Sequence, residues 1–220
     1  MDFVTARRNM VEGQVRTADV TDPNIVAAML DIPRERFLPP AKAGLAYLDF
    51  EVGLDQVADR PGRRLVRPMV LARLLQEAEI APRDRVLDVG CATGYSAAVL
   101  SRIAGSVFAL EEDAALARVA ERTLKEFGVS NVTVVTGPLA AGWPAVAPYD
   151  VILLDGASQA APRTLFGQLK EGGRLVGMIG RAPARGTIYR MDRGDVSGRP
   201  IFDAAAPLLP GFTLTPAFVF

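Results

Sequence analysis

An acid followed by a loop of small residues stands near the middle of the chain, in the stretch RVLDVGCATGYSA at 85–97. The apolar run around Asp88 is typical of a buried strand, and the residues after Gly94 are typical of a helix. Glycine permits a tight turn and a close approach to a ligand, and a helix N-terminus offers free N–H groups. The stretch therefore predicts a strand–loop–helix site for a small polar ligand.

The spacing of the small residues narrows the kind of ligand. A dinucleotide fingerprint requires G-x-G-x-x-G, but Ala92 and Tyr95 occupy its second and third glycine positions. The chain has no G-x-x-x-x-G-K motif either, which excludes a phosphate loop of that type. The loop instead resembles the acid-x-G-x-G-x-G loop of class I methyltransferases that bind S-adenosylmethionine, with Ala92 as the middle residue. A generic tight turn between a strand and a helix is the alternative.

Further candidate contacts stand where the next strands are predicted to end. Glu111 follows the loop by about twenty residues, where an acid accepts hydrogen bonds from ribose hydroxyls in nucleotide-binding folds. We expect residues 137–139 to lie along an adenine and Asp155 to face the pocket. The predicted cofactor-binding residues are Asp88, Gly90, Cys91, Gly94, Tyr95, Glu111, Glu112, Gly137, Pro138, Leu139 and Asp155.

Composition excludes several other kinds of chemistry. The 220 residues include no histidine, so no mechanism relies on an imidazole base or ligand. Lys and Arg total 25 and Asp and Glu also total 25, so no net field attracts nucleic acid or an anionic membrane. No apolar run approaches the ~20 residues of a membrane span. We expect a cytoplasmic protein with neither nucleic acid nor membrane as its partner; the stretch RPGRR at 60–64 is the one candidate for a local basic patch.

The single cysteine, Cys91, excludes an internal disulfide and a cysteine-cluster metal site, and we predict no bound metal. Its predicted place at a helix N-terminus, where thiol pKa values tend to fall, makes redox sensitivity the secondary interpretation. The other interpretation is a small residue selected for its fit.

An alternation of strands and helices has to position these residues. Strands are predicted at 85–89, 106–111, 131–137, 149–156, 174–180, 186–191 and 216–220, and helices at 21–33, 68–79, 93–105, 113–128 and 161–173. This order predicts an α/β fold, a Rossmann-like doubly wound sheet of about seven strands with an N-terminal helical layer. We predict one methyltransferase domain over 1–220, with a substrate-facing helical layer at 1–80 and the cofactor-binding sheet at 81–220.

Longer motifs carry a more specific resemblance. They are RRNMVEGQV, AAMLDIPRERFLP, AYLD, VLDVGCATGYSAAVL, NVTVV, APYDVILLDGA and LFGQLKEGGRLVGMIG. With them the chain resembles the protein-L-isoaspartate O-methyltransferases over nearly its whole length, most clearly from residue 7 to about 180. The resemblance implies S-adenosylmethionine as the cofactor and methyl transfer to a carboxylate of a damaged aspartyl residue in a protein or peptide substrate.

That chemistry suits a protein without histidine. The methyl group on a sulfonium is already activated, and a carboxylate nucleophile needs no general base. The protein mainly has to align oxygen, methyl carbon and sulfur and exclude water.

The chain departs from the family's motifs at three places. The family has Ile-Ser-Gln-Pro, with a serine tied to activity, where this chain has LVRP at 65–68. The aspartate of the family's Gly-Asp-Gly is Pro138, and the pair Asp155-Gly156 replaces a small hydroxyl or alanine pair. Since Val66 has no hydroxyl, we expect it to pack under the methyl region of the cofactor.

Val66 and Arg67 are the candidate catalytic residues, on a loop at 64–69 that we expect to meet the substrate. Arg67, with Arg63 and Arg64 beside it, is either a clamp for a substrate carboxylate or part of a solvated basic loop. The loss of the serine leaves two further interpretations open. One is a methyltransferase with a different acceptor, and the other is a non-catalytic binder of S-adenosylmethionine or S-adenosylhomocysteine.

Overall fold

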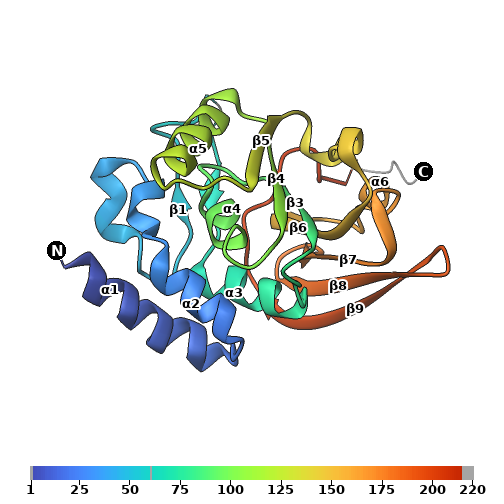
Figure 1. The fold of residues 1–220 in the computed structure, drawn as a ribbon, viewed down its shortest axis with the longest axis horizontal. Coiled ribbons are helices and arrows are strands. Elements are labelled where there is room, and N and C mark those ends of the chain that lie inside the picture. Colours follow the sequence, from blue (N-terminus) through green and yellow to red (C-terminus); the bar gives the residue numbers. More distant parts are fainter. Residues whose placement is uncertain (1, 60, 215–220) are drawn as a thin grey trace, which may run out of the picture.

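A seven-stranded mixed sheet runs through the molecule, which the computed structural model describes over residues 2–59 and 61–214 (Figure 1). Its strands are β3 (Arg85–Val89), β4 (Ser106–Glu111), β5 (Val132–Thr136), β6 (Tyr149–Ser158), β7 (Leu169–Ile179), β8 (Ala184–Asp192) and β9 (Asp195–Ala204). They lie in the order β5-β4-β3-β6-β7-β8-β9, parallel from β5 to β7 and antiparallel beyond. The expected Rossmann-like sheet is confirmed.

The chain leaves β3 toward β4 and β5 and then returns to pair β6 with β3, so the strand order reverses between β3 and β6. Ligands of such sheets bind beyond the carboxyl ends of the strands at this reversal. Asp88 pairs in register with Leu153 there, next to the predicted loop. The topology therefore places the opening motif at the expected ligand position.

Helices cover one face of the sheet more fully than the other (Figure 1). The helices are α1 (Phe3–Met10), α2 (Pro23–Asp31), α3 (Pro68–Glu77), α4 (Tyr95–Leu100), α5 (Ala114–Glu126) and α6 (Arg163–Phe166). Asp2, Asp22 and Asp113 cap α1, α2 and α5 by accepting hydrogen bonds from backbone N–H groups of the first turns. A two-stranded hairpin of β1 (Val52–Gly53) and β2 (Arg64–Leu65) joins the N-terminal helices to α3.

Two hydrophobic cores lie on opposite faces of the sheet, as the alternation of side chains along β3 illustrates. Val86 belongs to the core under the N-terminal helices, whereas Leu87 and Val89 belong to the second core. Short turns at Leu139–Ala141 and Pro144–Val146, helix α6 and the C-terminal segment, residues 205–212, cover that second core. The C-terminal segment contributes Leu209 and Phe212 to it.

The structure differs from the predicted elements on the C-terminal side. The helix predicted at 161–173 is limited to the four residues of α6, and β7 begins at Leu169. The glycines at 167, 172 and 173 weaken a helix there, and Gly172 adopts a φ of +74°. Strand β9 was not predicted, since its polar, exposed residues and Pro200 lack an apolar pattern. The strand predicted at 216–220 lies outside the described residues.

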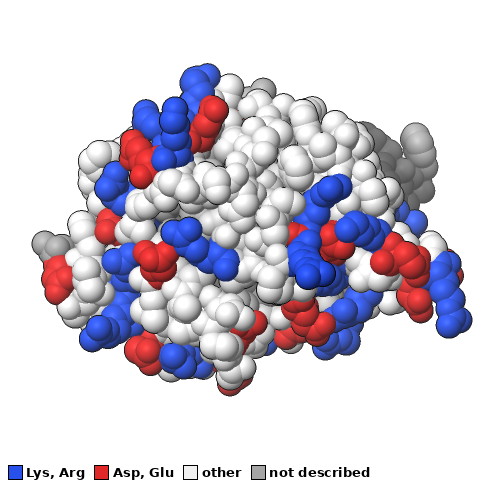
Figure 2. Space-filling model, in the orientation of Figure 1, with Lys and Arg blue, Asp and Glu red and all other residues white. Residues whose placement is uncertain are grey.

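The charges on the visible face agree with a chain that carries no net charge. Lys and Arg side chains lie beside Asp and Glu side chains around its margins, and an uncharged area crosses the centre (Figure 2). Within residues 2–59 and 61–214, each helix is too short or too polar to span a membrane.

Candidate functional site

The loop after β3 takes the backbone conformations that its small residues permit. Gly90, Ala92 and Gly94 have φ values of +86°, +52° and +94°. A Cβ at Gly94 would lie 3.1 Å from the Cβ of Ala120 on α5, so the glycine also allows the loop to pack closely on that helix. The loop therefore turns sharply and directs the N-terminus of α4 toward the end of β3.

Asp88 is the buried acid that precedes this loop. Its Oδ2 accepts a 2.6 Å hydrogen bond from the Ser96 hydroxyl, while its Oδ1 is buried and has no partner in the described part of the chain. Burial, and then the nearby charge of Asp155 in the C-terminal half of β6, raise the pKa of Asp88 well above its ordinary value. Burial also raises the pKa of Asp155 to about 6. The strand reversal thus brings two acids together in a dry environment.

Glu111, at the end of β4, is completely buried and fully hydrogen-bonded. Its Oε1 accepts the backbone N–H groups of Glu112 and Asp113, at 2.9 and 3.1 Å. Its Oε2 accepts the N–H of Ala92 at 2.8 Å and an N–H from Nη2 of Arg63 at 2.7 Å. The acid predicted to bind a ribose therefore already pairs with a cation of the chain itself.

Arg63 does not belong to a solvated basic loop. Its side chain is 4% exposed, and besides Glu111 it donates to the carbonyl of Gly90 at 3.1 Å. Its Nε and Nη1 are buried without a partner among the described residues. The neighbouring Arg64 is exposed. The predicted patch at 60–64 thus loses Arg63 to the interior.

Leu209 of the C-terminal segment fills the space beside two glycines of the site. A Cβ built on Gly90 or on Gly156 would lie 2.7 Å from side-chain carbons of Leu209. Real Cβ atoms essentially never come so close, so a side chain at either position would force Leu209 to shift, and at Gly156 also the carbonyl oxygen of Pro207, which would lie at 2.8 Å. The N–H of Leu209 donates to the carbonyl of Ala157 at 2.9 Å, which fixes the segment against the end of β6.

The thiol prediction was wrong in direction. Cys91 is completely buried, and burial followed by the charge of Asp88 raises its pKa well above the ordinary value. Helix-terminus effects that lower a thiol pKa are outweighed by the loss of solvent. The structure supports the interpretation of Cys91 as a small residue that fits its place.

The other predicted residues lie around this centre. Tyr95 is buried against the N-terminal layer, with the guanidinium of Arg34 4.6 Å from its ring centroid. The side chain of Val66 is buried, and Arg67 is half-buried, with an Nε that has no partner in the described chain. At the end of β5, Gly137 lies near Trp143, Pro138 is exposed, and Leu139 belongs to the second core.

Three side chains of the site were not predicted, namely Arg34, Ser96 and Leu209, whereas Arg63 was expected beside Arg67 in a clamp or in a solvated basic loop. Arg34 is completely buried and donates to the carbonyls of Ala46 and Val66, at 2.9 and 2.7 Å. The only available signal was its position inside the PRERF motif, which does not reveal that its side chain turns inward.

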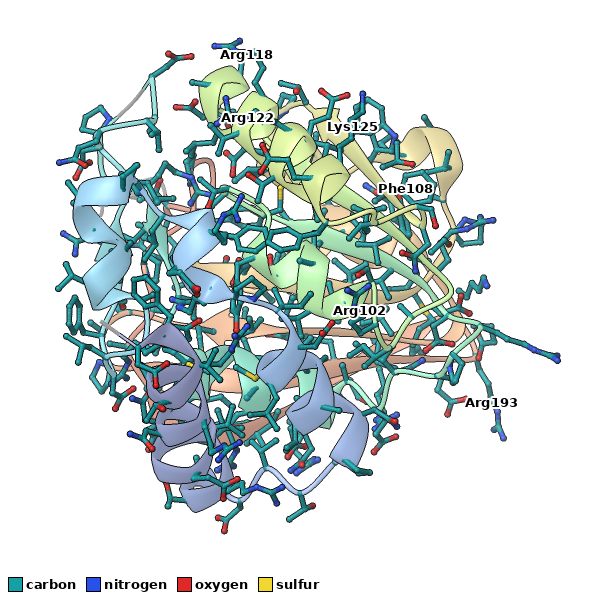
Figure 3. The ribbon with its side chains drawn as sticks, turned by 60° about the vertical axis from the view of Figure 1, so that its left-hand side comes forward. Arg102, Phe108, Arg118, Arg122, Lys125 and Arg193 are labelled. Carbon is teal, nitrogen blue, oxygen red and sulfur yellow. The ribbon has the colours of Figure 1, made fainter. Side chains whose placement is uncertain are left out.

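A groove of about 390 Å³ lies between the ERFLPP segment, residues 35–40, and α5. Thr93 of the loop lies in its lining and donates from Oγ1 to the carbonyl of Phe37 at 2.6 Å. Arg122 lines it from α5, and Figure 3 shows Arg118, Arg122 and Lys125 projecting outward from that helix. The groove therefore extends from the molecular surface to the loop that follows β3.

The strand order, the loop at the reversal point and the two acids at adjacent strand ends define a class I methyltransferase fold. A family model for protein-L-isoaspartate(D-aspartate) O-methyltransferase matches residues 5–200. The chain belongs to this family.

Curated relatives and solved structures agree with this assignment. The protein-L-isoaspartate O-methyltransferase of Protochlamydia amoebophila (strain UWE25) is 38% identical over 84% of this chain and 86% of its own length. That of Methylorubrum extorquens (strain PA1) is 38% identical over 92% and 85%. A solved protein-L-isoaspartate O-methyltransferase superposes with a TM-score of 0.80 at 27% identity, covering 93% of this chain and 66% of that one.

The residues of the site fit S-adenosylmethionine in kind. Asp88 Oδ1 is a buried acceptor without a donor among the described residues, and Gly90 and Gly156 present backbone without a Cβ to the space that Leu209 fills. Glu111 provides the acidic strand end. In this structure the side chain of Leu209 packs on both glycines, and Arg63 donates to the carbonyl of Gly90 and to Glu111.

The acid pair predicts a stability that depends on pH. The folded-state pKa of Asp155, about 6, exceeds its unfolded value of about 3.9, so the folded chain binds the extra proton. Its contribution to stability is therefore present below about pH 4 and is lost as the pH rises to about 6. Asparagine does not titrate, so we expect Asp155→Asn to avoid this loss, which amounts to up to about 3 kcal/mol of unfolding free energy.

Thermal and urea unfolding between pH 4.5 and 7.5 measure the effect. The variant should gain stability relative to the parent chain as the pH rises, whereas Asp195→Asn, at an exposed position on β9, should show a constant difference. Parallel curves for Asp155→Asn and the parent chain would contradict the expected role of burial.

Proposed function

We propose that the chain uses S-adenosylmethionine to methylate a carboxylate of a damaged aspartyl residue in a protein or peptide. The observation that carries the proposal is the family match over residues 5–200, with the acid–loop–helix arrangement of Asp88, Gly90 and Gly94 at the strand reversal. Since Cys91 is a free thiol, a cytoplasmic location is part of the proposal.

In this proposal, different residues of the site bind different parts of the cofactor. We assign Asp88 Oδ1 to accept from the ammonium group and the N–H groups at the start of α4 to donate to the carboxylate. Glu111 accepts from ribose hydroxyls, and residues 137–139 line the adenine. When bound, the cofactor supplies a methyl group already activated on a sulfonium.

The substrate side consists of the loop at 64–69 and the groove under the ERFLPP segment. Val66 provides a dry wall without a hydroxyl, and Arg67 has a buried Nε that lacks an acceptor. A guanidinium pairs with a carboxylate through two parallel hydrogen bonds. Arg67 therefore takes the role of holding the substrate carboxylate, which needs no base to react.

Methyl incorporation from labelled S-adenosylmethionine tests the proposal. We expect base-labile label in a peptide that contains isoaspartate and none in the same peptide with normal aspartate. Binding of S-adenosylhomocysteine without label in the isoaspartyl peptide would refute the proposed acceptor. Label in other proteins of an extract would then indicate a different acceptor, and no label anywhere would indicate a binder without turnover.

Replacement of Arg67 tests the carboxylate clamp. We expect Arg67→Ala to raise KM for the isoaspartyl peptide by roughly ten- to hundredfold, because a charge-assisted pair is lost. The affinity for S-adenosylhomocysteine should stay unchanged. Arg64→Ala, at the exposed neighbour, is the matched control and should retain the parent KM. Equal KM values for both variants would refute the clamp.

A further inference from the structure

The nucleoside end of the candidate site is closed by two parts of the chain that are distant in sequence. Arg63 enters from the hairpin of β1 and β2, and Leu209 enters from the C-terminal segment. Both contact Gly90: the arginine donates to its carbonyl, and the leucine lies over its α-carbon. They thus converge on the loop residue that a cofactor has to approach closely.

Arg63 holds Glu111 with the same kind of bond that a ribose would form. Its Nη2 donates to Oε2 at 2.7 Å, and the other three donors to this carboxylate are fixed backbone N–H groups. A ribose hydroxyl that donates to Oε2 therefore competes with the arginine alone. The Arg63 Nε and Nη1, buried without partners in the described chain, make this pair costly to keep dry.

The C-terminal segment is attached by a few backbone hydrogen bonds. The N–H of Ala157 donates to Pro207 at 2.7 Å, that of Leu209 to Ala157 at 2.9 Å, and that of Gln159 to Phe212 at 3.0 Å. The segment contains no helix and follows the edge strand β9. Its Leu209 and Phe212 are also buried in the second core, so local opening of the segment breaks these bonds and exposes two apolar side chains while the rest of the domain stays folded.

We propose that Arg63 and the C-terminal segment form a latch over the nucleoside position, and that an adenosyl cofactor binds by displacing both. This inference rests on the proposed use of S-adenosylmethionine. When open, the arginine reaches solvent beside the exposed Arg64, since its own backbone stays anchored through its carbonyl to the N–H of Leu54, at 2.8 Å. Because only open molecules bind the cofactor, the apparent association constant is the intrinsic constant multiplied by the fraction of molecules that are open.

Calorimetric titration of the full chain with S-adenosylhomocysteine tests the latch. We expect Arg63→Gln and Leu209→Ala each to bind about tenfold more tightly than the parent chain, as for a site that is open in about one molecule in ten. In Arg63→Gln the side-chain amide can still donate to Glu111. In Leu209→Ala the ion pair between Arg63 and Glu111 stays intact. Each variant therefore tests one half of the latch independently of the other. Leu208→Ala, at the exposed adjacent residue, should bind like the parent chain.

Hydrogen exchange supplies a second measurement. Saturation of the parent chain with S-adenosylhomocysteine should reduce the protection of the amides of Gln159 and Leu209, which join the segment to β6. Equal affinities for the four chains together with unchanged protection would refute the latch while leaving cofactor binding intact. Weaker binding by Arg63→Gln would show the arginine to be a ligand contact. No binding by any chain would refute the proposed function and the latch with it.

Discussion

The Glu111→Ala variant is expected to unfold with about 3–5 kcal/mol less free energy than the parent chain, because it leaves a buried cation without its anion. Arg63 is 4% exposed and pairs with this carboxylate, and three backbone N–H groups lose their acceptor as well. Urea unfolding at constant pH measures the change. The same variant should lose affinity for S-adenosylhomocysteine.

A double variant separates the cost of the unpaired Arg63 charge from the other costs of removing Glu111. We expect Glu111→Ala combined with Arg63→Met to recover part of the lost free energy of unfolding, because the unpaired buried charge is gone. Glu121→Ala, on the exposed side of α5, is the control and should change the free energy by less than about 0.5 kcal/mol. A loss for Glu111→Ala no greater than for Glu121→Ala would mean that the buried pair does not stabilise the site.

Removal of the Arg34 side chain is the second large effect, and we expect Arg34→Ala to cost about 3–5 kcal/mol of unfolding free energy. The guanidinium donates to the carbonyls of Ala46 and Val66 and stacks over Tyr95, so its loss leaves two buried acceptors and a cavity. Since these partners lie in the AYLD and LVRP motifs, one side chain holds these two parts of the N-terminal layer together.

The chain offers a matched control two residues away. Arg36 is 56% exposed and pairs with Glu126 across the surface groove, so Arg36→Ala should cost no more than about 1 kcal/mol. Arg34→Lys should fall between the two, because an ammonium does not reproduce the fork of the guanidinium. Chemical unfolding of the four chains gives the ranking, and an Arg34→Ala variant as stable as Arg36→Ala would contradict the anchoring role.

Local patterns were sufficient for the strands that carry the site. The runs that end at Asp88, Glu111 and Asp155 are apolar because their strands are buried on both faces, and such runs are readable without knowledge of the neighbours. The loop could be assigned to its class because its turn requires small residues at fixed positions. These features depend on sequence neighbours, and the structure confirms the fold that they predicted.

The sequence alone did not predict that Arg63 and Leu209 close the site, since this arrangement depends on contacts between residues that are distant in the sequence. Nothing in the stretch GRR tells which arginine turns inward; the answer lies in a carboxylate 48 positions away. The segment that carries Leu209 has no period of its own, and β9 forms because β8 offers it an edge. Cys91 shows a related limit, because a helix terminus predicts one direction of pKa shift and complete burial imposes the other.

The packing of Leu209 over the site depends on the absence of a single side-chain atom at Gly156. A single added methyl group there would lie 2.7 Å from two carbons of Leu209 and 2.8 Å from the carbonyl oxygen of Pro207, so the C-terminal segment would have to shift. A chain of the same fold with a side chain at this position would therefore hold the segment less closely than this one. Two such chains can share a family and a cofactor and still differ in how readily they admit it.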